Sequence, residues 1–225
     1  MKIAIFGSDT KEVEDIAKSL GLVIVNDSPD IVVSLGGDGT FMKSELEYPG
    51  IPKIALRNSK ICKKCHNLPN AEVIKKISLG EYNISEEKKL CTRFNGKEIV
   101  GMNEIIVHNK DPRKAIRYEI FVNDLKIGGE IIGDGVVIAT PFGSTGYYRS
   151  ITDSFFEVGI GVAFNNSTEQ SDHMVLRGDS RVTIKIIRGP AMVYADNHDS
   201  EIELNSGDEI VVEEFTDIAR IIQIK

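Results

Sequence analysis

Hydrophobic positions in the first third of the chain alternate between short continuous runs and a helical spacing. The continuous runs are rich in Ile, Val and Leu, which is typical of buried strands, and they span residues 2–7, 22–26, 30–35 and 53–57. Apolar residues recur every three or four positions over 13–20 and again over 71–78, so both segments predict helices. Strands alternating with helices predict a small Rossmann-like α/β domain, which we assign to residues 1–79.

From about residue 80 the pattern changes to short β-type runs separated by turn residues. These runs span 89–94, 98–108, 116–122, 125–131, 136–140, 158–163, 181–187, 192–195, 201–204 and 209–213. Asn95-Gly96 is a strong hairpin signal. We therefore predict a mostly antiparallel, β-rich domain over residues 80–225. The last run, 219–224, either ends this domain or returns to the first one.

Composition and charge narrow the class of protein. The chain has 225 residues, a net charge of −7 and a pI of about 5.2, which argues against a protein that coats nucleic acid or anionic membrane. No apolar run approaches the roughly 20 residues that span a bilayer, and the first residues lack the apolar region of a signal peptide. We expect a soluble cytoplasmic protein with no nucleic-acid or membrane partner.

Two glycine-rich runs carry candidate chemistry. The first, Gly36-Gly37-Asp38-Gly39-Thr40, follows a buried strand, and its glycines allow positive φ and let backbone N–H groups approach a phosphate without interference from a Cβ. Asp38 then lies at the carboxyl end of a strand, where open α/β sheets bind ligands. The second run, residues 133–148, has a comparable arrangement of glycines, a strand and hydroxyl groups. Either run alone is a weak signal, and together they are a strong one.

The cysteines form a separate pattern. Cys62-Lys63-Lys64-Cys65-His66 matches a c-type haem attachment string and, with Cys91, part of a zinc site. Haem attachment requires export, which nothing here indicates, and no second paired motif supports zinc. We expect reduced cysteines without metal, and the role of the four Cys and His side chains stays open.

The two glycine-rich runs, together with Asn103-Glu104, resemble the NAD kinase family. The first run is shared by a wider group of diacylglycerol, sphingosine and phosphofructo-kinases, and the run Thr140–Tyr147 selects NAD kinase within it. The resemblance extends from the first strand to Asp196. It implies an ATP- or polyphosphate-dependent transferase that phosphorylates the 2′-hydroxyl of the adenosine ribose of NAD, giving NADP. It also implies NAD and ATP as partners and Mg²⁺ or another divalent cation as cofactor.

Asp38 suits this chemistry because a ribose hydroxyl is a poor nucleophile. A carboxylate that accepts its proton typically contributes about 10²–10⁴-fold, and Asp38 could also hold Mg²⁺ on the triphosphate, two roles that the sequence does not separate. Gly37, Gly39 and Thr40 would contact phosphate oxygens, and Lys43 would offset the charge that develops during transfer. The alternative is a turn that merely ends a strand, with Asp38 capping the next helix.

The resemblance assigns the dinucleotide to the second half of the chain. Asn103 can pair with an adenine edge, Glu104 can accept from ribose hydroxyls, and Asp134 would brace the site. The remaining residues that carry over as substrate-binding are Thr145, Gly146, Tyr147, Ser150 and Asp196. Members of the family are homodimers or homotetramers in which the matching tyrosine reaches a neighbouring subunit, so Tyr147 is expected to do the same.

Several departures from the family pattern leave alternatives open. Residues 57–66 replace a glycine-rich segment that carries an aromatic residue, and Ile132, Phe142 and Gly146 replace other residue types. One alternative is a related kinase that acts on a lipid or sugar hydroxyl. Another is a diverged NAD(P)-binding sensor without turnover. The sequence does not distinguish ATP from polyphosphate, NAD from NADH, or dimer from tetramer.

Overall fold

The computed structural model describes residues 1–58, 62–168, 172–196 and 198–225, and it divides into two compact units. The first unit comprises residues 1–87 and 218–225, and the second comprises 88–217. Residues 59–61, within the segment 57–66 that departs from the family pattern, and Asn197, beside Asp196, lie outside the described residues. No helix in the described ranges has both the length and the apolar character needed to cross a membrane.

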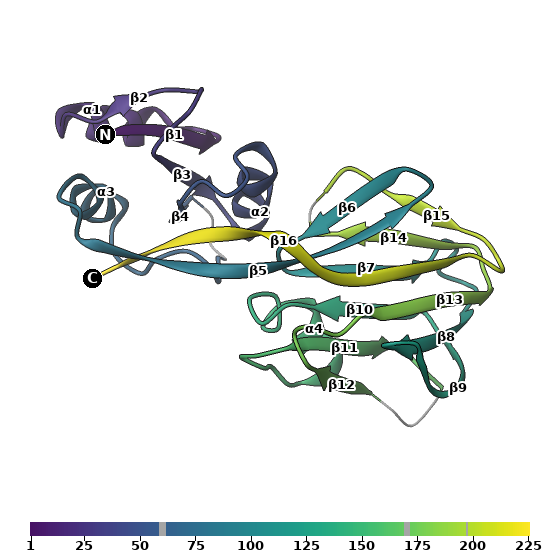
Figure 1. Ribbon diagram of the computed structural model, residues 1–225. Coiled ribbons are helices and arrows are strands. Elements are labelled where there is room, and N and C mark those ends of the chain that lie inside the picture. The colour runs from purple at the N-terminus through teal and green to yellow at the C-terminus, as the bar shows by residue number, and fades with distance from the viewer. Residues whose placement is uncertain (59–61, 169–171, 197) are drawn as a thin grey trace. The chain divides into compact units, whose positions relative to one another are not determined.

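The first unit is a parallel sheet with helices (Figure 1). Its strands pair in the order β2-β1-β3-β4, and the last part of β16 joins β4 in parallel, with Ile221 opposite Lys53. This arrangement confirms the expected α/β class. The elements are β1 (Lys2–Gly7), α1 (Lys11–Ser19), β2 (Val23–Ile24), β3 (Ile31–Gly36), α2 (Asp38–Glu47), β4 (Lys53–Arg57) and α3 (Asn70–Ser78).

The core of the first unit explains its continuous apolar runs. Strand β3 is buried from Ile31 to Leu35, as expected for a parallel strand covered on both faces. The apolar stripes of α1 and α3 pack onto the sheet, and Ile222 of β16 belongs to the same cluster. Two buried strands, β3 and β4, therefore fix the position of the polar segments that follow them.

The second unit is antiparallel, which confirms the expected β-rich class. A six-stranded sheet has the order β12-β11-β10-β7-β14-β15, and β16, β13, β8 and β9 pair in a second antiparallel arrangement. Apolar residues from both arrangements form one cluster. The remaining elements, of which β5 and β16 have residues in both units, are β5 (Tyr82–Phe94), β6 (Lys97–Gly101), β7 (Glu104–Asn109), β8 (Ile116–Val122), β9 (Leu125–Gly133), β10 (Gly135–Ala139), α4 (Tyr147–Thr152), β11 (Ile160–Asn165), β12 (His173–Leu176), β13 (Val182–Arg188), β14 (Ala191–Ala195), β15 (Ile202–Leu204) and β16 (Glu209–Ile224).

Two sequence expectations about elements are wrong, and two short elements were not expected. The run 98–108 is two strands, β6 and β7, because the backbone between them turns aside at Met102-Asn103. The runs 209–213 and 219–224 are one strand, β16, which continues through a polar stretch. Helix α4 and strand β12 were not expected, since each is too short to establish a hydrophobic period.

Candidate functional site

The turn after β3 leads directly into helix α2. Gly37 precedes the helix with φ −104°, and Asp38 is its first residue. The positive φ that glycine allows is not used at these positions, because neither Gly36 nor Gly37 has one and Gly39 lies inside the helix. Gly36 is required for a different reason. A Cβ there would lie 2.3 Å from the hydroxyl oxygen of Thr40, so only glycine lets that side chain approach the strand.

The Asp38 carboxylate is bound by the loop that follows β4. The backbone N–H of Lys63 donates to Oδ2 at 3.1 Å, and the backbone N–H of Lys64 donates to Oδ1 at 2.9 Å. Cys62 Sγ lies 3.3 Å from Oδ1. Among the described residues no side chain caps α2, so the capping alternative for Asp38 is not observed. Asp38 is thus a half-buried carboxylate whose two oxygens both accept backbone hydrogen bonds.

The same loop contains a disulfide between Cys62 and Cys65, whose Cα atoms are 5.4 Å apart. The expectation that these cysteines are reduced is therefore wrong in this structure. It rested on the compartment, whereas the three-residue separation brings the two side chains within bonding distance. Cys91 is free and buried on β5, and burial raises the pKa of its thiol. Within the described residues, no group of three or more His, Cys, Asp or Glu gathers as a metal site.

Helix α2 carries the other candidates of the first unit. Gly39 and Thr40 lie in its first turn with Asp38, and Lys43 lies further along on an exposed position. The first turn of a helix presents backbone N–H groups and a partial positive charge, which suits phosphate oxygens. The four candidates therefore share one helix, with the acidic residue at its start.

In the second unit, the Asp196 carboxylate organises the backbone between β6 and β7. It accepts backbone N–H groups from Met102 at 2.6 Å, Asn103 at 2.8 Å and Glu104 at 3.1 Å. Burial raises the pKa of the Asp196 carboxyl group, and the three donors act in the opposite direction. These bonds hold the backbone in a turn, which explains why the expected single strand is interrupted here. Asp196 thereby positions Asn103 and Glu104.

The loop between β10 and α4 packs against this break. The backbone N–H of Thr140 donates to the carbonyl of Asn103 at 2.8 Å, and the Thr140 hydroxyl accepts from the backbone N–H of Gly143 at 3.0 Å. A Cβ at Gly143 would lie 2.1 Å from the Asn103 carbonyl oxygen, so glycine is needed for this approach. Gly146 precedes α4, and a Cβ built there would be 3.8 Å from a carboxylate oxygen of Glu104.

Asp134 and Tyr147 are held by asparagine side chains. The Asp134 carboxylate accepts from the Asn109 amide at 3.1 Å and from the Asn166 amide at 3.0 Å. The Tyr147 hydroxyl accepts from the Asn165 amide at 2.9 Å. None of these three asparagines was singled out in the sequence. Their signal was their place at the ends of β7 and β11, where polar side chains follow buried strands.

The phenol of Tyr147 is affected by the charges of two candidate site residues, Asp134 and Glu104. Burial raises the pKa of its phenol, and the negative charges of Asp134 and Glu104 raise it further, because a phenolate would be repelled by both. Its ring packs against the small cluster around Val137, Ala139, Tyr148 and Ala163 of the same chain.

The remaining candidates lie nearby in the sequence but differ in their contacts. Thr145 lies in the loop before Gly146. The exposed Ser150 donates its hydroxyl to the Tyr147 carbonyl at 2.7 Å, a bond within α4. The structure therefore gathers Asn103, Glu104, Asp134, Gly146 and Tyr147, with Asp196 supporting them, and it does not bring the Ser150 hydroxyl to this group.

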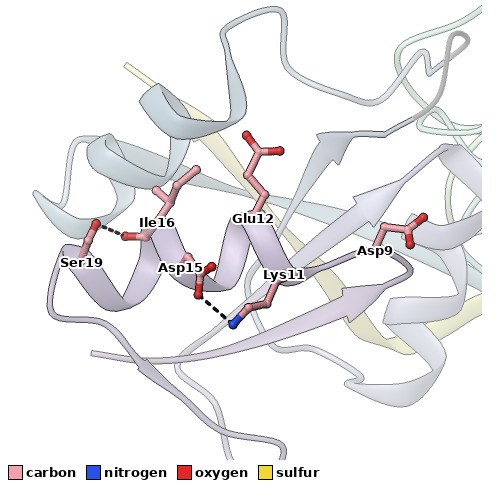
Figure 2. A pocket seen from close by; sticks show the side chains of 6 residues that line it. All are labelled: Asp9, Lys11, Glu12, Asp15, Ile16 and Ser19. Atoms are coloured by element: carbon pink, nitrogen blue, oxygen red, sulfur yellow. Dashed lines mark hydrogen bonds and ion pairs between the residues drawn. The ribbon is translucent and has the colours of Figure 1, made fainter.

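A surface pocket lies along α1 in the first unit (Figure 2). Asp9, Lys11, Glu12, Asp15, Ile16 and Ser19 line it. Asp15 pairs with Lys11 at 3.0 Å, and Ser19 donates to the Ile16 carbonyl within the helix. No predicted site residue lines this pocket, so we do not assign the site to it.

Comparison with solved structures identifies the fold. The chain matches an NAD kinase from Archaeoglobus fulgidus, solved in complex with ATP, with a TM-score of 0.83 at 19% identity. That match covers 100% of this chain and 94% of the other. It matches yeast NADH kinase, solved with NADH, with a TM-score of 0.85 at 18% identity, covering 100% and 84%. The architecture is therefore that of the solved NAD kinases.

Sequence comparison then assigns the family. Residues 102–224, more than half of the chain, match the ATP-NAD kinase C-terminal domain. An NAD kinase from Pyrococcus abyssi is 32% identical over 191 residues, covering 81% of this chain and 67% of that protein. The chain belongs to the NAD kinase family, as the resemblance of its motifs predicted.

Some relatives are considerably longer. A bifunctional NADP phosphatase/NAD kinase from Methanocaldococcus jannaschii is 27% identical over 207 residues, which cover 85% of this chain and 36% of that protein. An NAD kinase from Methanopyrus kandleri is 29% identical over 167 residues, which cover 70% and 60%. The chain thus spans about a third of the bifunctional relative and three fifths of the second.

Proposed function

We propose that this chain is an NAD kinase, transferring a phosphoryl group from ATP or polyphosphate to the 2′-hydroxyl of the adenosine ribose of NAD. The observation that carries the proposal is the arrangement around Asn103 and Glu104. Asp196 fixes both residues beside the loop that ends at Gly146 and Tyr147, and all of them lie in the segment that matches the family. Membership of the family supplies the class of reaction.

Asp38 is the proposed base. The ribose hydroxyl attacks the terminal phosphorus of the donor, its proton passes to the Asp38 carboxylate, and ADP or a shortened polyphosphate leaves. The first turn of α2, with Gly37, Gly39 and Thr40, supplies N–H and hydroxyl donors for phosphate oxygens. The Lys43 ammonium offsets charge during transfer, which depends mainly on positioning and electrostatics.

A divalent cation fits the donor set of Asp38. Its carboxylate oxygens are the hard ligands that Mg²⁺ prefers, and each has a second lone pair beside the backbone hydrogen bond that it accepts. Mg²⁺ commonly binds one or two carboxylates plus substrate phosphates, so a gathering of three acidic groups is not required. When bound, the ion would neutralise charge on the phosphates of the donor.

Asn103 and Glu104 would recognise the adenosine part of NAD. The amide oxygen of Asn103 is buried without a hydrogen-bond partner among the described residues, so it can accept from the amino group of adenine. Glu104 would accept from ribose hydroxyls. Thr145, Gly146 and the flat ring of Tyr147 would contact the remaining part of the dinucleotide, with Asp134 as a brace.

The direct test is incubation with NAD, Mg²⁺ and either ATP or polyphosphate, followed by enzymatic detection of NADP. We expect NADP to form with at least one donor. Parallel incubations with diacylglycerol and with a sugar acceptor address the related lipid and sugar kinases. Phosphorylation of one of those acceptors without NADP would contradict the proposal and favour that alternative.

A second candidate is an NAD(P)-binding sensor without turnover. The observation in its favour is that the backbone N–H groups of Lys63 and Lys64 already donate hydrogen bonds to the Asp38 carboxylate, the group that a kinase would use as base. Calorimetric titration with NAD and NADP separates the two functions. A sensor binds the dinucleotide but forms no NADP with any donor, whereas a kinase does both.

We also propose that the active form is a cytoplasmic homodimer or homotetramer in which Tyr147 contacts the dinucleotide of a neighbouring subunit. Short exposed edges of the β-rich unit favour self-association. The packing of the Tyr147 ring within its own chain favours the opposite. Mixing inactive Asp38→Asn chains with inactive Tyr147→Ala chains tests the idea. Activity should return in mixed oligomers, and its absence after verified subunit exchange would exclude shared sites.

A further inference from the structure

The disulfide loop beside Asp38 is the one sequence motif that the proposed function leaves unused. Cys62 and Cys65 close this loop, which follows β4, and the two residues between them, Lys63 and Lys64, donate backbone hydrogen bonds to the carboxylate. Cys62 Sγ lies 3.3 Å from the nearer oxygen. The disulfide and the proposed base therefore form one cluster, in which a change at sulfur alters the surroundings of the carboxylate.

The two sulfurs differ in access and in electrostatic surroundings. Both cysteines are nearly covered, at 8% and 9% exposed, so a reductant needs a defined route. Cys65 lines a pocket of about 420 Å³ whose wall also contains Lys63, Lys64 and His66. The ammonium groups of the two lysines attract an incoming thiolate and stabilise a thiolate on Cys65. The Asp38 carboxylate beside Cys62 instead repels a thiolate on Cys62.

We propose that Cys62–Cys65 is a reversible thiol–disulfide exchange site, whose substrate is an external dithiol and whose state controls the hold of the loop on Asp38. A thiolate of the dithiol attacks Cys65 Sγ through the pocket. The Cys62–Cys65 bond breaks as a mixed disulfide forms, and Cys62 leaves as a thiolate that takes up a proton. The second thiol of the dithiol then closes its own disulfide and releases Cys65. The protein gains two electrons, and the dithiol loses two.

The consequence for activity follows from the geometry of the closed loop. The disulfide restricts residues 62–65, and the N–H groups of Lys63 and Lys64 keep the carboxylate turned toward the loop. The reduced loop has more conformations available, so it releases Asp38 toward a substrate hydroxyl. Reduction should therefore raise turnover. This consequence rests on the proposed kinase function, whereas the exchange site itself does not.

The first experiment follows reduction of the folded protein by dithiothreitol, with alkylation and peptide mass mapping to locate each thiol. We expect Cys62 and Cys65 to become alkylated without unfolding. In Asp38→Asn reduction should be about threefold to tenfold faster, because the departing Cys62 thiolate no longer faces a carboxylate. Asp15→Asn, which removes an exposed carboxylate on α1, is the matched control and should react like the parent. Reduction only after unfolding, or equal rates in Asp38→Asn and the parent, would overturn the proposal.

The second experiment compares NADP formation by the oxidised and reduced protein. We expect the reduced form to turn over about fivefold faster, the factor that corresponds to one net hydrogen bond. Cys62→Ser/Cys65→Ser should stay at the reduced level under both conditions. If that variant does not fold, the comparison between the oxidised and the reduced parent protein is the test. Equal turnover of these two forms would overturn the proposal that the disulfide controls Asp38. If neither state forms NADP while the reduction rates differ as expected, the kinase proposal fails and the exchange site stands.

Discussion

Asp38 and Asp196 are two carboxylates that accept backbone N–H groups, and they differ in what supplies the donors. The donors to Asp196 belong to the turn between β6 and β7, two strands of different sheets, and one of the donors, Glu104, begins β7. The donors to Asp38 belong to a loop outside the strands that a disulfide closes. The Asp196 carboxylate is therefore held by backbone that adjoins two strands. The Asp38 carboxylate is held only while the disulfide loop keeps its conformation. This suits a group that must turn toward a substrate.

The largest expected effect comes from replacing Asp38 by Asn. The amide keeps the shape of the side chain but cannot accept a proton, so kcat should fall by about 10²-fold or more while the affinity for NAD is largely kept. Steady-state kinetics and calorimetric titration measure the two quantities. Asp15→Asn serves as control and should leave both unchanged, and a near-normal kcat in Asp38→Asn would remove the base from the mechanism.

Replacing Asp196 by Asn tests the structural carboxylate. The amide can serve only one of the two oxygen positions, so at least one backbone N–H near Asn103 loses its acceptor and the charge is gone. We expect the free energy of unfolding to fall by about 2 kcal/mol, and NAD binding to weaken. Urea denaturation checks the stability. Asp208→Asn, where the carboxylate accepts one backbone N–H from Asn205, should change it far less. Equal losses in both variants would contradict the role given to Asp196.

A smaller effect is expected for Tyr147→Phe. This change removes the hydroxyl that accepts from Asn165 and leaves the ring in place. The affinity for NAD should fall about fivefold, which corresponds to one hydrogen bond of about 1 kcal/mol. The adjacent Tyr148→Phe is a matched control, because the buried Tyr148 hydroxyl has no hydrogen-bond partner among the described residues. An equal loss in both variants would show that Tyr147 acts only through general packing.

The smallest expected effect concerns alkaline pH and the phenol group of a buried tyrosine, Tyr118. The buried Tyr118 donates to the Gly135 carbonyl at 2.9 Å, and burial raises its pKa well above the ordinary range. Its folded pKa exceeds the unfolded value of about 10, so its contribution to stability is complete below pH 10 and is lost as the pH rises above it.

Tyr118→Phe should therefore lose less stability than the parent between pH 9 and pH 10.5, by about 0.8 kcal/mol. Urea denaturation at several pH values between these limits provides the measurement. Parallel pH profiles for the two proteins would show that Tyr118 does not remain protonated in the folded state.

The sequence predicted the fold where hydrophobic period alone decides it. Continuous apolar runs located β3 and β4, and the change near residue 80 separated parallel from antiparallel pairing. It could not predict the break between β6 and β7, because that break depends on Asp196, which lies more than 90 residues further along the chain. The assignment of the two domains to residues 1–79 and 80–225 stays a prediction.

The site was predictable only where its residues stand in a motif. Asp38, Asn103-Glu104 and the loop to Tyr147 could be placed on elements in advance, and their roles stay predictions. The partners of Asp134 and Tyr147 could not be predicted, since Asn109 and Asn165 come from other strands. The disulfide was missed because a compartment was assumed, and its position beside Asp38 was missed because the cysteines follow β4 whereas Asp38 follows β3.

Strand β16 has a consequence for the order in which the protein is made. Its last residues, 218–225, belong to the first unit, where Ile221 pairs with β4 and Ile222 enters the core. A ribosome releases these residues only after the whole second unit has emerged. The unit that is synthesised first therefore stays incomplete until then, with one side of β4 unpaired. The second unit can complete its core before the first does.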